Sequence, residues 1–573
     1  MKAITIAILG ILTSASVLHA DEYDLVVYGS SPAAISAAVQ AKRMGLRAVI
    51  VSPEKRIGGL TTGGLGQTDA GVTWAFGGIA REFYRDVARH YARPESWTRQ
   101  KAADYLPDGQ CAGTKAADAM WTFEPSVALG ILEGWEKRDG LDIRRGKRLD
   151  RTSGKVKVDE VEVEGRGRQR KIRSFLTEDG TEYCGKVFVD ATYEGDLMAA
   201  AGCSYAVGRE ANAVYGETNN GIEFRYARWH QLMPKVDPYV VPGDPKSGLL
   251  PGIEAPVGGE KDGDGDRRIQ AYCFRMCLTD DPSNRIPFAK PAEYDEREYE
   301  LLLRNFEAGE TRIPWINSKM PNRKTDTNNS RGCSTDFIGR NWAWPEASYD
   351  EREKIFAAHL AYQRGLMWTL ANHPRVPESI RNEVAKWGTC RDEFTDGPGD
   401  GWQSQLYVRE ARRLIGEYVM TEHNCRGDRL APHPVALAAY GMDSHHVRRR
   451  VTAEGFVQNE GDVEDNRVIA PFGPDGARSK AGPRLSPYPI DYGAIVPKRS
   501  EVANLIVPVC VSASHMAFGS IRMEPVFFAL GQVAGTAAAL SVHGSSNVQD
   551  VSYADLRDRL LADGQVLSGN KMK

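Results

Sequence analysis

The stretch Tyr23–Gly66, YDLVVYGSSPAAISAAVQAKRMGLRAVIVSPEKRIGGLTTGGLG, decides the fold of this chain. Its first apolar run, Leu25–Tyr28, ends at Gly29, and a second, β-branched run follows at Arg47–Val51. Between them Ala33–Met44 is rich in alanine and contains no helix breaker. This order predicts a strand, a tight turn, a helix and a second strand. In such β-α-β units the first turn points backbone N–H groups at a pyrophosphate, which requires small residues there.

The turn departs from the usual dinucleotide pattern G-x-G-x-x-G. The three positions hold Gly29, Ser31 and Ala34, so only the first glycine is kept, although each substitute is small. The acid that usually ends the second strand and binds a ribose is replaced by Ser52, with Glu54 two residues further on. Taken alone, this pattern is equally compatible with an ordinary buried β-α-β unit.

Three later features favour a ligand. Gly58–Gly66 consists mostly of glycine and threonine, which suits a backbone that passes close to a flat molecule. In Lys186–Asp196 a buried strand ends at Asp190, followed by small residues and acids before an alanine-rich helix. That pattern is typical of a ligand-facing edge of an open sheet, or simply of a helix capped by acids. A third strand, Asn504–Val509, leads through a polar turn into a helix over Glu524–Leu540.

Composition narrows the class of protein. The chain has 573 residues, 26% of them charged and 42% hydrophobic, which predicts a globular protein with two or more domains. The net charge of -3 indicates no excess of basic residues that would bind nucleic acid or an anionic membrane, so a small-molecule ligand is expected. The nine cysteines include no C-x-x-C, which signals neither a zinc site nor a redox dithiol, and no metal is expected. One or two disulfides are compatible with this count, but their pairing is open.

The N-terminal residues 1–20 predict a secretory signal peptide cut after Ala20, because Lys2 precedes an apolar run and small residues. The alternative is a buried N-terminal strand. No later stretch is expected to approach the ~20 apolar residues of a spanning helix. An exported chain without a twin-arginine pair crosses unfolded, so it would acquire any cofactor afterwards.

The remaining segments are assigned more coarsely. Helical spacing is found at Ile79–Tyr91 and at Ser126–Arg138, with Ser126 as a plausible N-cap, and antiparallel strands are expected over Leu141–Ile172. Residues 205–488 are dense in Pro, Gly, Asn, Trp and charge, and predict an inserted substrate domain. Its expected helices lie near Glu293–Asn305, Tyr349–Asn372 and Gln405–Glu422. The alternating Asp262, Asp264 and Asp266 are not an EF-hand, since Arg267 and Cys273 stand where the turn glycine and bidentate glutamate belong.

Several segments together resemble one family. They are GGLTTGGLGQTDAG, VDATYEGDLMAAAG, GREANAVYGE, RKTDTNN, QLYVREARR, DSHHVRR and NLIVPVCVSASHMAFGSIRMEPVFFALGQVAGTAAAL. The chain is similar to the bacterial FAD-dependent oxidoreductase family, sometimes labelled xanthan-lyase-like, over nearly all of its mature length. The resemblance implies an α/β fold with a glutathione-reductase-type Rossmann FAD domain built from discontinuous segments. Residues 21–204 and 489–573 would form that domain, and residues 205–488 an inserted α+β substrate domain.

The resemblance also implies which residues contact FAD. The pyrophosphate and ribose would meet Gly29, Ser30, Ser31, Ala33, Ala34 and Ser52, or Glu54 in place of Ser52. The glycine run would pass the flavin with Gly58, Gly59, Gly63, Gly64 and Leu65, and the second edge would supply Asp190, Ala191 and Thr192. The C-terminal part would contribute Gly519, Ser520, Gly531 and Val533 near the ring and ribityl chain.

The candidate catalytic residues follow from flavin chemistry, which needs a base for the departing proton and positive charge beside the reduced ring. His515 is the leading base and Arg522 the candidate anion stabiliser; the alternatives are a structural histidine and an ordinary salt bridge. His445, beside His446, is expected to reach the site from the insert. On a helix over Gln405–Glu422, Arg409 would share a face with Arg412 or Arg413, so at most one such pair points at the substrate, and the other arginines form surface or structural ion pairs. The polar loop holding Lys324, Asp326, Asn328 and Asn329 offers groups that bond hydroxyls, or is a solvated turn.

These expectations define a function. The chain is expected to be an exported FAD-dependent oxidoreductase that transfers a hydride between flavin and a polar organic substrate, with a sugar-derived compound as the leading choice. The electron acceptor, the mode of flavin attachment and the oligomeric state are left open. Two alternatives stand: a catalytically inactive carbohydrate-binding protein on the same fold, and a lyase that uses FAD structurally.

Overall fold

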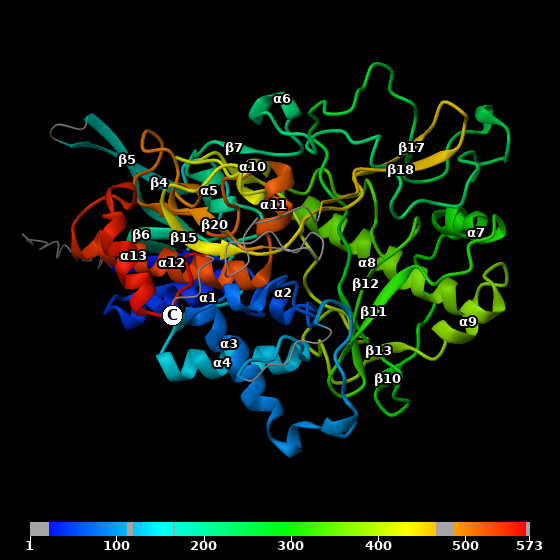
Figure 1. Cartoon of the computed structure of the whole chain (residues 1–573), viewed down its shortest axis with the longest axis horizontal. Coiled ribbons are helices and arrows are strands. Elements are labelled where there is room, and N and C mark those ends of the chain that lie inside the picture. The colour runs from blue at the N-terminus through cyan, green and yellow to red at the C-terminus, as the bar shows by residue number, and fades with distance from the viewer. Residues whose placement is uncertain (1–21, 112–117, 164–166, 466–485, 569–573) are drawn as a thin grey trace, which may run out of the picture.

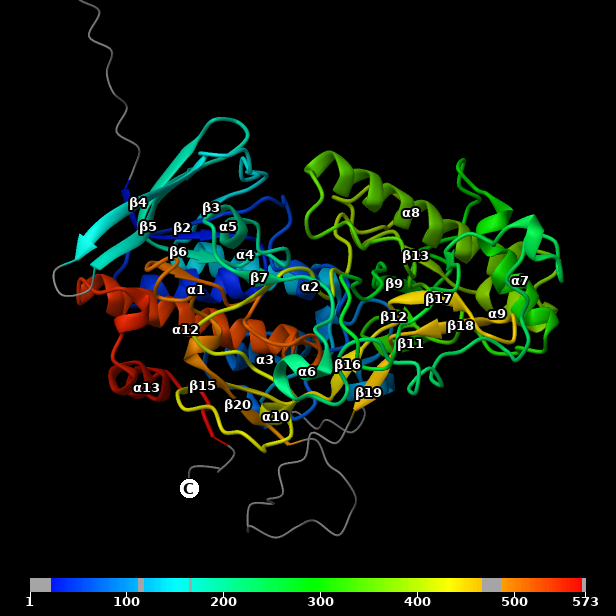
Figure 2. The same cartoon turned by 90° about the horizontal axis from the view of Figure 1, so that it is seen from above.

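Figure 1 shows the computed structural model, which describes residues 22–111, 118–163, 167–465 and 486–568. The predicted signal peptide lies outside these residues. The described chain forms two lobes, one around a mostly parallel sheet and one around a smaller antiparallel sheet with a long helix beside it (Figure 2). One continuous hydrophobic core runs through both, from Leu25 in the first lobe to Leu366 in the second.

The first lobe confirms the β-α-β prediction. Strands β1 (Glu22–Tyr28) and β2 (Ala48–Val51) are parallel neighbours joined by helix α1 (Pro32–Arg43). On the far side of β1 lies β6 (Glu182–Asp190), also parallel, and β21 (Leu505–Ile506) joins β6 from the C-terminal part of the chain. Three widely separated segments therefore build one parallel sheet, as the resemblance implied.

The strands expected over Leu141–Ile172 are confirmed in part. β4 (Val156–Val163) and β5 (Gly167–Leu176) form an antiparallel hairpin that continues onto β6. The first strand of the region, β3 (Asp142–Arg144), instead pairs parallel with β2 and extends the Rossmann sheet. A three-residue strand cannot show its direction in sequence, because direction depends on the segment it pairs with.

Helix α12 (Glu524–His543) is the buried centre of the first lobe. Glycines let it approach α1 closely: a side chain at Gly531 would overlap Ala33 and Ser36, and one at Gly535 would overlap Ala37. Among the described helices, α12 alone is long and apolar enough to cross a membrane, but 89% of that apolar window is buried inside the fold. This corrects the expectation that no stretch after the leader has such length and composition.

The second lobe is organised by the sheet β10-β13-β9-β12-β11 and by α8 (Tyr349–Asn372), whose bounds coincide with the predicted helix. A capping box at Ser348 and Glu351 starts α8. The sheet strands are β9 (Met276–Thr279), β10 (Arg285–Ile286), β11 (Trp315–Met320), β12 (Lys324–Asn329) and β13 (Gly388–Cys390). The polar loop expected around Lys324 is therefore a buried strand.

Other predicted helices are found with shifted ends. α3 (Gly78–Tyr91) is as expected, α7 is Glu300–Glu307, and α4 (Pro125–Asp139) starts after Glu124, so Ser126 is inside the helix and not its N-cap. The prediction of a helix over Gln405–Glu422 is wrong, because that segment is extended and irregular apart from β14 (Arg413–Leu414). Its arginines are buried and each pairs with a different part of the chain, which a helix would not allow.

The remaining elements are short. The helices are α2 (Gly59–Thr62), α5 (Asp196–Ala200), α6 (Asn212–Tyr215), α9 (Glu378–Val384), α10 (Glu422–Cys425), α11 (His515–Ile521) and α13 (Tyr553–Ala562). The strands are β7 (Tyr205–Ala206), β8 (Ile253–Glu254), β15 (Pro434–Ala438), β16 (Met442–Ser444), β17 (Arg448–Val451), β18 (Val457–Glu460), β19 (Val463–Asp465) and β20 (Tyr488–Asp491). β15 pairs with β20 and packs against α12, so part of the predicted insert lies on the first lobe.

Candidate active site

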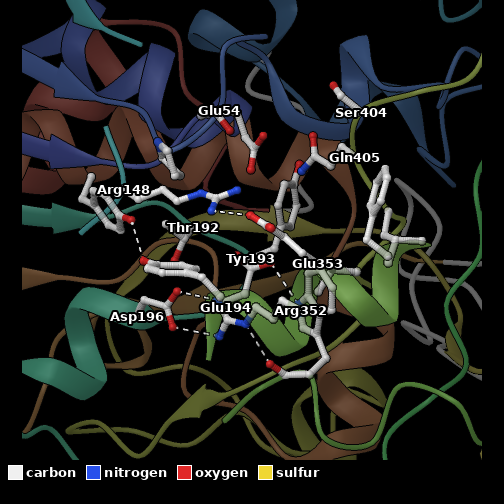
Figure 3. A pocket seen from close by; sticks show the side chains of 18 residues that line it. Glu54, Arg148, Thr192, Tyr193, Glu194, Asp196, Arg352, Glu353, Ser404 and Gln405 are labelled. Carbon is white, nitrogen blue, oxygen red and sulfur yellow. Dashed lines mark hydrogen bonds and ion pairs between the residues drawn. The ribbon is translucent and has the colours of Figure 1, made fainter. Parts of the chain in front are cut away.

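A cavity of about 290 Å³ opens at the carboxyl ends of β1, β2 and β6, between the Rossmann sheet and α8 (Figure 3). Ser30, Glu54 and Thr192 line its first-lobe wall, and Tyr349 and Arg352 of α8 line the opposite wall. The strand order reverses between β1 and β6, which is the point where open α/β sheets bind ligands.

The turn after β1 is packed against the edge after β6. Gly29 has φ +134°, and a side chain there would overlap the backbone of Ala191. The Ser31 hydroxyl donates to the Ala191 carbonyl at 2.7 Å and does not cap α1. The small residues of the turn therefore allow the end of β1 to pack against the end of β6. The Ser31 side chain does not cap the N–H groups in the first turn of α1.

At the end of β2 the acid that faces the cavity is Glu54. Ser52 is fully buried, and its hydroxyl donates to the Glu54 carbonyl at 2.6 Å, so it holds the turn and does not line the cavity. Burial, and next repulsion from Glu194, raise the pKa of Glu54 to about 7. Of the two groups expected for the ribose, Glu54 lines the cavity and Ser52 does not.

The glycine run is clamped to the rest of the first lobe by one buried carboxyl. Glu524, the first residue of α12, accepts hydrogen bonds from Thr61 and from Tyr193, at 2.9 Å each. Tyr193 in turn accepts from the backbone N–H of Leu60 at 3.0 Å, and a side chain at Gly59 would overlap the Tyr193 hydroxyl. Burial raises the pKa of Glu524 to about 7. The three parts of the discontinuous lobe therefore meet at this carboxyl.

A second cavity, of only about 10 Å³, lies on the other side of this clamp. Its wall includes Leu65 from the glycine run, Asp69, Tyr407, Arg522 and Glu524. Burial raises the pKa of Asp69 to about 6, although the neighbouring Arg275 opposes the shift. The cavity thus places a carboxyl that titrates near neutral pH beside a guanidinium, next to the glycine run.

Arg522 lines this small cavity. Its guanidinium donates to the Asp443 carboxylate and carbonyl, both at 3.1 Å, and to the Tyr407 hydroxyl at 3.2 Å. Its Nε is buried with no hydrogen-bond partner among the described residues. The salt bridge that was the alternative for Arg522 is therefore present, with Asp443 as the partner. The guanidinium also faces the small cavity.

His445 and Arg409 belong to the same charged network. Asp336 contacts both, with Oδ2 3.1 Å from His445 Nδ1 and Oδ1 2.9 Å from the Arg409 guanidinium. Burial and Arg409 disfavour the imidazolium of His445, but Asp443 and Asp336 outweigh them and raise its pKa. Arg409 also stacks over the Tyr407 ring, 4.4 Å from its centroid. Both residues therefore support the wall of the small cavity from behind.

His515 is placed differently. Its Nδ1 lies 2.8 Å from Glu410 Oε2 and its Nε2 lies 3.0 Å from the Ser444 hydroxyl, so both ring nitrogens have protein partners. Burial, and next the nearby Arg413, lower its pKa to about 3. It lines neither of the two cavities described above. The geometry favours the structural alternative over the predicted base.

Several expected cofactor contacts are packing contacts instead. A side chain at Gly519 would overlap Asp443, the Ser520 hydroxyl donates to the Tyr440 carbonyl at 2.6 Å, Gly531 meets α1, and Val533 is buried within α12. Asp190 is also committed, because it accepts from Thr192 and from the Met198 N–H at the start of α5. The alternative of a helix capped by acids therefore holds for Asp190, while Thr192 and Glu194 do face the larger cavity.

Comparison with known proteins decides the family. The sequence matches the family described as FAD dependent oxidoreductase over residues 24–560. The chain belongs to this family. It is therefore an FAD-dependent oxidoreductase, which confirms the enzyme class and the cofactor expected from its sequence. No curated protein matches it.

Solved structures share a smaller part of the enzyme. AlpK is 17% identical over 33% of this chain and 35% of its own, with a TM-score of 0.21. THI4 of Thermovibrio ammonificans is 16% identical over 33% and 66%, with a TM-score of 0.22. A flavin-containing monooxygenase from Stenotrophomonas maltophilia is 17% identical over 34% and 43%, with a TM-score of 0.18.

The residues of the larger cavity fit FAD. Ser30 of the turn after β1 and Thr192 after β6 line this cavity with small polar side chains, and Glu54 offers a carboxyl group where the second strand ends. When bound, FAD supplies a two-electron acceptor and donor. The protein contributes the position of the cofactor and the charges around it.

Sequence reasoning missed Asp69, Tyr193 and Glu524. Asp69 and Tyr193 stand in segments that carried the family resemblance, and Glu524 opens the predicted C-terminal helix. Each of these residues therefore lies in a segment that the sequence analysis had singled out. The role of Glu524 could not be predicted, because its partners lie 331 and 463 residues away along the chain.

Proposed function

We propose that this enzyme oxidises, or in reverse reduces, a polar organic substrate whose reacting group is bound next to Asp69 and Arg522. The observation that carries the proposal is that these two groups line the same small cavity next to the glycine run. A sugar-derived compound remains the leading substrate class, supported by the hydroxyl-bonding groups Asp69, Thr61 and Tyr407 around that space.

Asp69 is the group we assign to proton transfer. Oxidation of an alcohol or amine releases a proton, which a base must accept, and the best base has a pKa near the working pH. Burial brings the pKa of Asp69 to about 6, so it is largely ionised at neutral pH and close enough to the solution pH to give the proton back. Asp69 replaces His515 in this role.

Arg522 is the group we assign to charge stabilisation. Its guanidinium is fixed by Asp443 and Tyr407, so no side-chain reorganisation is needed when negative charge develops beside it. FAD, held along the larger cavity, is the redox partner, and its ribose hydroxyls are assigned to Glu54. We also propose export, directed by residues 1–20, with FAD acquired after the chain has crossed.

The proposal is tested by anaerobic bleaching of the bound flavin with a panel of sugars, uronic acids and amines. An Asp69→Asn variant should keep the flavin absorbance spectrum and slow flavin reduction by roughly 10²-fold or more, the usual effect of a lost base. Glu133→Gln, an exposed change on α4, is the matched control and should leave the rate unchanged.

Three outcomes would overturn parts of this proposal. A purified protein with no flavin bands and no uptake of added FAD would favour the inactive binding protein. Product formed over many turnovers without any electron acceptor would favour the lyase, because an oxidase or dehydrogenase stops after one reduction. Unchanged reduction kinetics in Asp69→Asn would remove Asp69 from the reaction.

A further inference from the structure

We propose that Cys277 and Cys390 form an intramolecular disulfide when the chain folds in an oxidising environment. The two residues stand on neighbouring antiparallel strands, β9 and β13, where Thr389 pairs with Leu278. The next pair outward is Cys390 opposite Cys277, and their sulfur atoms are 3.7 Å apart. Directly opposed residues of an antiparallel pair have Cα atoms about 4.5–5.5 Å apart, within the range that disulfides span.

The surroundings of the two thiols favour a covalent bond over a metal site. Both sulfurs are buried in a small apolar cluster with Met320 and Phe394. Lys324 lies close by, its ammonium held by Glu393 at 2.7 Å and Glu124 at 2.9 Å, and a fixed cation opposes the binding of a metal ion. Within the described ranges, no group of three or more His, Cys, Asp or Glu side chains is arranged to hold a metal.

The short ladder between β9 and β13 gives the disulfide a structural purpose. These strands pair only at Gly388 with Thr279 and at Thr389 with Leu278. On its other edge β9 pairs with β12, where Asp326 holds Arg275 through two hydrogen bonds of 2.8 Å. A bond between cysteines 113 residues apart would close a long loop containing α7 and α8 and fix β13 to the sheet beside the site.

The chemistry is thiol–disulfide exchange. Formation of the S–S bond removes two protons and two electrons from the two thiols, and a disulfide-bearing oxidant of the same compartment accepts them and becomes a dithiol. The attacking species is a thiolate, and burial raises the pKa of Cys277 well above its ordinary value. The exchange therefore takes place during folding, before the strands close over the sulfurs.

The experiment uses the full chain, unfolded under reducing conditions and refolded with FAD in a buffer of reduced and oxidised glutathione. Remaining thiols are alkylated, and the digested protein is mapped by mass spectrometry. We expect one linked peptide pair joining Cys277 to Cys390, which leaves seven of the nine cysteines alkylated. Reduction of this protein should lower its Tm by several degrees.

Two variants make the result specific. A Cys277→Ser/Cys390→Ser double variant should show no change of Tm on reduction, while Cys184→Ser, a half-buried cysteine on β6, should keep the full change. Refolded protein with both Cys277 and Cys390 alkylated, or linked to other cysteines, overturns the proposal. If refolding yields are low, the chain is partly opened in urea so that the strands no longer cover the sulfurs, oxidised with diamide, and then mapped and judged in the same way. The disulfide does not depend on the proposed reaction, so failure of one leaves the other standing.

Discussion

At the scale of single residues, the site distinguishes groups that are already satisfied from groups that are poised to react. His515 is buried between Glu410 and Ser444, each within hydrogen-bond distance of one ring nitrogen. Asp69 shares an enclosed cavity with Arg522, and its pKa is about 6. A histidine with a pKa of about 3 is neutral at all working pH values, so it acts here as a hydrogen-bonding spacer.

We therefore predict opposite effects for His515→Ala and Asp69→Asn. His515→Ala leaves the buried Glu410 carboxylate without one of its partners, which should cost about 1–3 kcal/mol of stability. Its rate of flavin reduction should stay within a few-fold of the parent. Asp69→Asn should lose the rate, and its Tm above pH 6 should be equal to or higher than that of the parent, because asparagine removes a carboxyl that is costly to ionise when buried. Thermal unfolding and stopped-flow flavin reduction on both variants decide the matter; a large loss of rate with an unchanged Tm in His515→Ala would restore His515 as the base.

At the scale of elements, the two lobes are joined at the start of α5. Asp196 accepts from three arginines that come from three different segments: Arg151 at 3.1 Å, Arg352 of α8 at 2.6 Å and Arg412 at 2.8 Å. Burial would raise its pKa, but the three guanidiniums outweigh burial and hold it well below the ordinary value. The single carboxylate is therefore the shared ion-pair partner of three cations, which keep backbone carbonyl acceptors but lose this negative charge if it is removed.

Asp196→Asn should consequently destabilise the protein by about 3–5 kcal/mol, the usual cost of breaking a buried ion pair from one side. Arg148→Gln is the control. It removes a pair of similar length, 2.6 Å to Glu353, which also joins the first lobe to α8 (Figure 3). Because both partners are largely exposed, at 42% and 60%, the loss should be at most about 1 kcal/mol. Denaturant unfolding of the two variants measures the difference, and equal losses would contradict the assignment of Asp196 as the joint.

Element by element, the sequence predicted what local pattern controls. The β-α-β unit and α8 were predicted correctly, because each depends on residue patterns within one segment. Gln405–Glu422 was predicted wrongly as a helix, because its arginines are stabilised by partners such as Asp336, Asp196 and Glu210, which lie far away in sequence. The same limit applies to the site. Glu54 and Arg522 were named as candidates from the sequence, but the hydrogen bonds of Glu524 join residues far apart in the chain and were not predicted.

At the scale of the whole molecule, buried carboxyls set the response to pH. Burial raises the pKa of Glu54 and Glu524 to about 7 and that of Asp69 to about 6. A carboxyl whose pKa is raised by folding contributes its full stability below its unfolded pKa, and that contribution is lost as the pH rises through the folded value. The FAD-free protein should therefore lose stability between about pH 4.5 and pH 8, as these groups ionise in a poorly solvated environment.

Glu524→Gln tests this directly, because glutamine keeps the size of the side chain and cannot ionise. A rise of the pKa from 4.5 to about 7 corresponds to a penalty on the order of 3 kcal/mol above pH 7 that the variant does not have. The stability of the variant should therefore increase relative to that of the parent as the pH rises from 5 to 8. This difference is measured as a flatter curve of Tm against pH. Glu133→Gln, on the exposed face of α4, should follow the parent at every pH. Parallel curves for Glu524→Gln and the parent would show that Glu524 does not titrate in this range.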